Sequence, residues 1–432
     1  MHNSSIAAAI LLALSPFALA HAAADETGDG GLDARARQIH QRVLTLDSHV
    51  DVLLPATPKQ YWGKDGKSAA EVSKLRAGGI DALALAIAVG PGPRTPAGDA
   101  EAKAEAAERL ATIQSFIRDN PKDVALALTA ADVERIHAEG KIVVIESFLN
   151  ARSLGGRLDA IDDYYKQGVR LFAFAHAGNN DFADSSRPTG YPAVEHHGLS
   201  ALGKQAVTRL NRLGIIIDVS QIAPEAVLQV LQLTRAPVIA SHSDARALVD
   251  NTRNLSDAEL DAIKKNGGVV HVTPFNSYLA KVPPAIAEKI KAVRVEYGLK
   301  PAYVANRASY TEGKEGLSKE REQKFVDSIN ALIPRATIAD YVDHIDYIAK
   351  RIGVDHVGIG SDFNHGSGIT GFSDESEAPN ITRELVRRGY TEEQIGKIWS
   401  GNFLRVFRAV EAVAKAQGAR KTGTIVSKAK LS

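Results

Sequence analysis

The 432-residue chain contains no cysteine, and its positive and negative charges almost cancel. Without cysteine the protein has no disulfide, no lipid-modified N-terminal cysteine and no thiol that could act as nucleophile or metal ligand. Any metal must therefore be bound by His, Asp, Glu or neutral oxygen donors. The formal net charge of +1 offers no basic field for a polyanion, which argues against nucleic acid as a partner.

Several other signals are also missing. There is no Gly-x-Ser-x-Gly segment, which argues against a serine hydrolase. Gly90–Pro93 is a rigid turn without the lysine pattern of a phosphate-binding loop. The apolar run Ile6–Ala20 is shorter than the ~20 residues that span a membrane, and small residues follow it. We therefore expect residues 1–23 to be a signal peptide and the protein to be exported, to the periplasm or the medium.

Eight short apolar runs alternate with helical patterns along the rest of the chain. Continuous apolar runs of this length are typical of parallel strands that are covered on both faces. Eight of them alternating with helices predict an α/β protein, a (β/α)₈ barrel of TIM type over residues 33–417. The runs are 43–49, 80–89, 141–146, 168–176, 214–220, 236–242, 267–273 and 356–362.

Two segments fall outside this alternation. Residues 276–352 are charged and helix-rich, and we interpret them as a helical insertion near the active site. Residues 418–432 are basic and rich in small side chains, which predicts a flexible tail.

Polar side chains follow the predicted strands where each one ends. In a (β/α)₈ barrel these ends meet on one face, where the active site is assembled. Side chains about 300 positions apart in the sequence would then share one pocket. The residues are His49, Asp51, Glu146, His176, Ser220, Gln221, His242 and Asp362.

Several of these residues are the donor types that zinc accepts. His49 and Asp51 lie on the same side of an extended segment and can chelate one cation, although a strand-end hydrogen bond is the plainer alternative. Glu146 follows four β-branched residues. It could bridge two cations or form a salt bridge with a barrel Lys or Arg. His242 is a natural imidazole ligand, and Asp362 could bind metal or act as general base toward a metal-bound water.

Together these residues resemble the membrane (renal-type) dipeptidase family of the amidohydrolase superfamily. The similarity runs from about Arg37 to Ala414, and the ordered set is more specific than any single motif. The motifs are His49-Val50-Asp51, Glu146, His176 with Asn179, 236–243, Arg253-Asn254, 360–363 and 401–406.

The resemblance implies a zinc-dependent hydrolase that cleaves dipeptides with a metal-activated water. Under it, His49 and Asp51 are ligands of a first zinc, Glu146 is a bridging carboxylate and His242 is a ligand of a second zinc. It also implies a homodimer.

The same resemblance assigns the residues that contact the substrate. His176 would act near the scissile carbonyl, and Arg253 would hold the free carboxylate of the dipeptide with its planar guanidinium. Asp362 would be the acid/base aspartate. Asn179 and Tyr278 align with pocket residues.

One position departs from the family pattern. A histidine ligand is expected after the fifth strand, where this chain has Gln221. An amide oxygen is a poorer donor to zinc than imidazole, so we expect one firmly bound Zn²⁺ and a second site that Gln221 weakens.

Other histidines are given structural roles. His196 and His197 are interpreted as solvated, and His271 as a core residue. His365 stays open, since it follows Asp362 by three residues on the active-site side.

Two other functions remain compatible with these residues. One is a metal-dependent amidohydrolase acting on N-acyl amino acids or another small amide, because such substrates also carry a carboxylate for Arg253. The other is a catalytically silent binding protein.

Overall fold

A computed structural model describes residues 29–188, 192–301, 310–311, 313–314 and 316–429. The predicted signal peptide, residues 1–23, lies outside the described residues. Among the helices that the structure describes, none is long and apolar enough to cross a bilayer.

Eight parallel strands form a nearly closed barrel, each paired with the next in chain order. Beyond the last strand the backbone returns to the first: the Asp362 amide donates to the His49 carbonyl (2.9 Å) and the Asp51 amide donates to the Phe363 carbonyl (3.1 Å). The predicted (β/α)₈ barrel is confirmed. The strands are β1 (Leu46–Asp51), β2 (Ala82–Ala88), β4 (Ile142–Leu149), β5 (Val169–Ala173), β6 (Ile216–Asp218), β7 (Ile239–Ala240), β8 (Val269–Val272) and β9 (Val357–Ile359).

A ninth strand, β3 (Val124–Leu126), pairs with β4 outside the barrel path. This strand is not predicted from the sequence.

The pleat of the strands separates an inner from an outer core. Val143 and Ile145 of β4 pack inside the barrel with Leu46 of β1, over Phe403 and Phe407. Ile142, Val144 and Phe148 of the same strand belong to the larger cluster beneath the helices. Side chains alternate between the two faces of a strand, so Glu146 lies on the same outer face as Val144 and Phe148.

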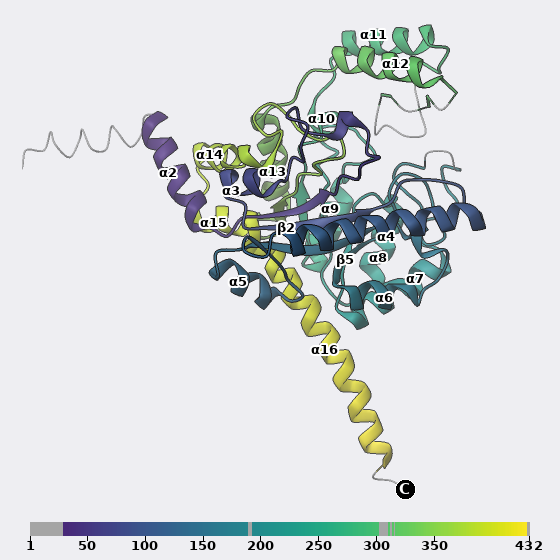
Figure 1. Ribbon diagram of the computed structural model, residues 1–432, viewed down its shortest axis with the longest axis vertical. Coiled ribbons are helices and arrows are strands. Elements are labelled where there is room, and N and C mark those ends of the chain that lie inside the picture. The colour runs from purple at the N-terminus through teal and green to yellow at the C-terminus, as the bar shows by residue number, and fades with distance from the viewer. Residues whose placement is uncertain (1–28, 189–191, 302–309, 312, 315, 430–432) are drawn as a thin grey trace, which may run out of the picture.

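Helices cover the outside of the barrel (Figure 1). Several start at a side-chain cap, as in α9, where Ser256 and Glu259 form a reciprocal capping box. The helices are α2 (Asp29–Arg42), α3 (Val72–Gly78), α4 (Pro96–Asp119), α5 (Ala130–Ala138), α6 (Ala160–Gln167), α7 (Ala201–Leu213), α8 (Pro224–Leu233), α9 (Asp257–Asn266), α13 (Ile338–Ile352), α14 (Pro379–Arg387), α15 (Glu392–Gly396) and α16 (Asn402–Ala429).

The predicted insertion is helical, but only its first part leaves the barrel. It contains α10 (Asn276–Leu279), α11 (Pro284–Glu296) and α12 (Lys319–Leu332). Helices α11 and α12 pack around a small core of their own and project from the barrel (Figure 1). Helix α13, at the end of the predicted range, instead buries its apolar face in the main core and is a barrel helix.

Helix α16 both closes the barrel and extends beyond it. Its first turns close the barrel with Phe403, Val406, Phe407 and Val410. The helical backbone then continues to Ala429, away from the barrel, where a flexible tail from residue 418 was predicted (Figure 1).

Candidate metal centre

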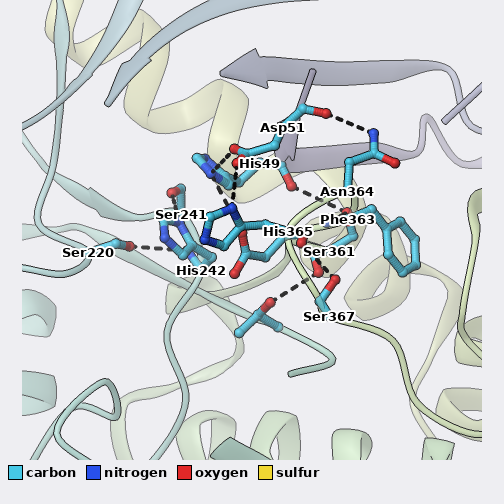
Figure 2. Close-up of polar contacts among 12 residues, drawn as sticks. His49, Asp51, Ser220, Ser241, His242, Ser361, Phe363, Asn364, His365 and Ser367 are labelled. Carbon is cyan, nitrogen blue, oxygen red and sulfur yellow. Dashed lines mark hydrogen bonds and ion pairs between the residues drawn. The ribbon is translucent and has the colours of Figure 1, made fainter. Parts of the chain in front are cut away.

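The barrel brings His49, Asp51 and His242 together at the carboxyl ends of the strands (Figure 2), and Asp362, after β9, joins them. The Nε2 atom of His49 lies 3.3 Å from Asp51 Oδ1 and 3.9 Å from Asp362 Oδ1. The imidazole of His242 is stacked on that of His49, with ring centroids 4.0 Å apart. All four side chains are buried, so a polar cluster drawn from β1, β7 and β9 is enclosed in the mouth of the barrel.

The donor atoms fit a divalent cation. One atom from each of His49, Asp51 and Asp362 lies within 4.8 Å of the others. Within the described part of the chain, both ring nitrogens of His49 and the Oδ1 atom of Asp51 are buried without a hydrogen-bond partner. Unpartnered buried polar atoms are costly and need an explanation. A cation bound by one ring nitrogen of His49 and by Oδ1 of Asp51 would satisfy two of these three atoms.

A second group of possible ligands combines His49 and His242 with Asp218. Both oxygens of Asp218 are already engaged: Oδ1 accepts from the amides of Ser220 and Ser241, and Oδ2 accepts from the Ser241 hydroxyl at 2.5 Å. We therefore assign Asp218 a supporting role.

Ser241 transmits that support to His242. The Nδ1 atom of His242 lies 2.6 Å from the Ser241 hydroxyl, which fixes the orientation of the ring. Burial and the charges of His49 and Arg253 hold the pKa of His242 well below its usual value. The ring is therefore in its neutral form, the form that binds metal.

The structure does not bring Glu146 to this centre, which corrects the prediction of a bridging carboxylate. Strand β4 continues to Leu149, so Glu146 lies within the strand and not at its end. Its side chain points to the outer layer, where Oε2 lies so close to Gly168 that a Cβ there would be 2.7 Å away. Burial, partly offset by Arg170, raises the pKa of Glu146 to about 7. Of the two predicted roles of Glu146, proximity to a barrel arginine therefore agrees better with the structure than a bridging role does.

The inward position at the end of β4 is occupied by Leu149. This side chain packs with Ala86, Ala88 and Ala173 in a small apolar cluster. Gln221, after β6, has a left-handed backbone (φ 71°), and its Nε2 lies 2.9 Å from Nε2 of His242. Within the described residues, the charged ligand candidate on the β4–β6 side of the mouth is therefore Asp218, whose two oxygens are already engaged by Ser220 and Ser241.

Asp362 has the properties of a proton acceptor held in place. Burial raises its pKa to about 6, and Asp51 adds to the rise although His365 and His49 oppose it. Its backbone is left-handed, with φ 53°. A non-glycine residue in that region is strained, and such strain concentrates at functional sites.

His176, predicted to contact the substrate, lies beside this centre. Its Nδ1 atom is buried and has no hydrogen-bond partner in the part of the chain described. Burial and the positive charges of His365 and Arg187 hold its pKa well below the usual value. His176 is therefore neutral and has a ring nitrogen left for a ligand.

Of the remaining predicted substrate residues, Arg253 and Tyr278 lie close to each other, whereas Asn179 is held by hydrogen bonds within its own loop. Arg253 is buried, donates to the His242 carbonyl at 3.0 Å and lies 5.3 Å from the ring of Tyr278. The amide of Asn179 is engaged by its own loop, donating to the Pro192 carbonyl (2.9 Å) and accepting from the Ser185 amide (2.8 Å). Asn179 thus braces the pocket wall.

His365 joins the site although sequence reasoning gave it no role. Its Nδ1 atom lies 3.0 Å from Asp51 Oδ2, and its ring stands edge-on to His176 with centroids 4.9 Å apart. The only sequence signal was its position three residues after Asp362.

The chain is similar to known dipeptidases. Residues 33–421 match the model of the family described as membrane dipeptidase, peptidase family M19. A dipeptidase named tcpJ from Claviceps purpurea is 32% identical over 293 residues, which cover 68% of this chain and 56% of that protein. The dipeptidase aclJ from Aspergillus oryzae is 29% identical over 311 residues, 71% of this chain and 61% of the relative.

A solved structure agrees over a larger share. The probable dipeptidase PvdM from Pseudomonas aeruginosa has a TM-score of 0.80 and 38% identity, and the match covers 90% of this chain and 100% of that one. By contrast, the chain spans only 56% and 61% of the two curated relatives' length.

Proposed function

The chain belongs to the membrane dipeptidase family, peptidase family M19, and from this we propose that it is a metal-dependent dipeptidase with one zinc ion in its centre. The observation that carries the proposal is the set of buried, unpartnered donor atoms on His49 and Asp51, which converge with Asp362. His49 and Asp51 would hold the ion. When bound there, zinc lowers the pKa of a water to about 7 and polarises a carbonyl.

The residues around the ion would transfer protons, stabilise the carbonyl oxygen and bind the substrate. Asp362, with its pKa near 6, accepts the proton of the attacking water and returns it to the leaving amine. His176 is neutral and donates a hydrogen bond to the carbonyl oxygen as negative charge develops on it. Arg253 holds the free carboxylate of the substrate, so that the cleaved bond lies one residue from the C-terminus.

A single zinc ion follows from the asymmetry of the mouth. Glu146 faces away, Leu149 is apolar, and the Nε2 atom of His242 is hydrogen-bonded to Gln221. On that side a second ion would find the imidazole of His242 and the carboxylate of Asp218, whose two oxygens are already hydrogen-bonded to Ser220 and Ser241.

Export and dimerisation complete the proposal. Export is supported by the apolar segment Ile6–Ala20, and a homodimer by the family resemblance alone. Immunoblots of periplasm and medium, and light scattering of the purified protein, test these two points.

Metal analysis combined with a substrate panel tests the main proposal. We expect about one zinc per chain, hydrolysis of dipeptides and loss of activity with a chelator. Faster hydrolysis of N-acyl amino acids would favour the alternative amidohydrolase. A metal-replete protein that cleaves neither class would be the catalytically silent binding protein.

A further inference from the structure

His365 contacts the metal centre from outside the proposed set of ligands. Its Nδ1 atom donates to Asp51 Oδ2 at 3.0 Å, the carboxylate oxygen that does not face His49. Its ring is parallel to that of Tyr61 (interplanar angle 2°, centroids 5.6 Å apart) and meets His176 edge-on. Two aromatic neighbours therefore restrict how far the imidazole can rotate.

The loop that carries His365 is fastened to the segment after β1. The Asn364 amide donates to the Asp51 carbonyl at 2.7 Å (Figure 2). It also donates to the Ser68 hydroxyl at 3.0 Å, and its oxygen accepts from the Ala69 amide at 2.9 Å. Asn364 is left-handed, with φ 68°. This conformation is uncommon for a residue other than glycine. The position of His365 over Asp51 is thus built into the backbone.

We infer that His365 is a positioning residue that holds the Asp51 carboxylate in its ligand orientation, an inference that rests on the proposed metal centre. By engaging Oδ2, His365 leaves Oδ1 directed toward His49 without another partner. Groups that hydrogen-bond a ligand in this way orient it and tune its affinity for the ion. Here the contact matters more than usual, because the carboxylate of Asp218, at the end of β6, is already hydrogen-bonded to Ser220 and Ser241 and is not free to hold the ion if Asp51 rotated.

The His365 side chain is also partly exposed to solvent, at 30%, in contrast to Asp51 at 4%. His365 thus lies between the buried ligand and solvent, and its removal should affect metal binding directly.

Cobalt binding to His365 variants tests the inference without relying on peptide hydrolysis. Co²⁺ substitutes for zinc and reports ligand geometry by its visible absorption. For H365A we expect about 10- to 100-fold weaker Co²⁺ binding at an unchanged stoichiometry. H365N, whose amide nitrogen can take the place of Nδ1, should restore most of the affinity. H365Q, which places its amide where Nε2 lies, should not.

The matched control is H137A, which removes a histidine 40% exposed on α5 and should bind Co²⁺ like wild type. Equal Co²⁺ affinity in H365A and wild type would overturn the inference, as would equal affinities of H365N and H365Q. Loss of a full equivalent of cobalt would make His365 a ligand, which also contradicts a positioning role. If wild type binds Co²⁺ but cleaves no dipeptide, the proposed function fails and the inference on His365 stands.

Discussion

The two sides of the barrel mouth have the same architecture and opposite chemistry. The β9–β1 side carries His49, Asp51, Asp362 and His365, whose polar atoms face one another within hydrogen-bonding or coordination distance. The β4–β6 side presents Leu149, the neighbouring alanines and the neutral amide of Gln221, and its carboxylate, Asp218, is engaged by serine donors. In the same barrel, one side is arranged to bind an ion and the other is packed.

Strand phase explains this difference better than residue type does. Strand β4 does contain a carboxylate, Glu146, but it lies three residues before the end of the strand and on the outward face. A side chain on a strand reaches the mouth only if it points inward and lies near the carboxyl end. A shift of one residue along a strand therefore turns a side chain from the inner face, where it can bind a metal, to the outer face, where a carboxylate is merely buried.

The largest effect is expected from Asp362→Asn on the charged side. The amide keeps an oxygen near His49 but cannot accept a proton, so kcat should fall by about 10²- to 10⁴-fold. Metal content should stay near the wild-type value. Steady-state kinetics combined with metal analysis checks both expectations. Loss of the metal would instead identify Asp362 as an essential ligand.

Arg253→Lys tests whether Arg253 holds the free carboxylate of the substrate. Lysine keeps the charge but not the planar pair of donors, so kcat/KM for dipeptides should fall by about 10- to 100-fold, mainly through KM. Dipeptide amides, which lack the free carboxylate, are the control and should be cleaved equally by both proteins. An equal loss with both substrates would contradict the proposed role of Arg253.

Sequence reasoning grouped His49, Asp51 and Asp362, which the structure brings together. It also grouped Glu146 with them, which the structure does not, and the difference has a physical reason. His49 and Asp51 are two residues apart at the end of a short strand, so their common direction follows from the pleat alone. For Glu146 the end of the strand had to be known. An acidic residue after four β-branched ones looked like that end, whereas β4 continues through Ser147 to Leu149.

The family resemblance, which is confirmed by the match over residues 33–421, could not correct this error. It suggested a carboxylate after the strand, and Glu146 was the nearest one. His365 was missed for the opposite reason, because its contact with Asp51 depends on a loop turned by Asn364, and no strand or helix periodicity describes such a loop.

A double variant should make the two sides more alike. Gln221→His alone restores one imidazole beside His242 but leaves Leu149 apolar, so we expect little change in metal stoichiometry. Leu149→Glu combined with Gln221→His supplies a carboxylate and two histidines, and should approach two ions per chain. Titration with zinc monitored by calorimetry distinguishes these outcomes.

Leu149→Glu alone is the control for the double variant. It places an unpaired carboxylate among alanines and should lower the free energy of unfolding by about 3 kcal/mol or more, with metal addition restoring little. Two ions bound to Gln221→His alone would show that β4 is not what limits the second site.

The smallest effect on the metal centre is expected from Glu146→Gln. Because Glu146 faces the outer layer beside Gly168, metal affinity and turnover should match wild type. Stability should change instead. The pKa of Glu146 is raised from 4.5 to about 7 in the folded protein. Its protonated form therefore stabilises the fold below pH 4.5, and that contribution is lost as pH rises through about 7.

Glutamine does not titrate. The free energy of unfolding of the variant, relative to that of wild type, should therefore rise by about 3 kcal/mol between pH 4 and pH 8. Denaturant unfolding of the metal-free proteins at several pH values measures this difference without interference from the ion. Parallel pH curves would contradict the burial of an isolated carboxylate. Loss of metal from the variant would show that Glu146 is a ligand of the metal centre. The contrast drawn between the two sides of the mouth would then be wrong.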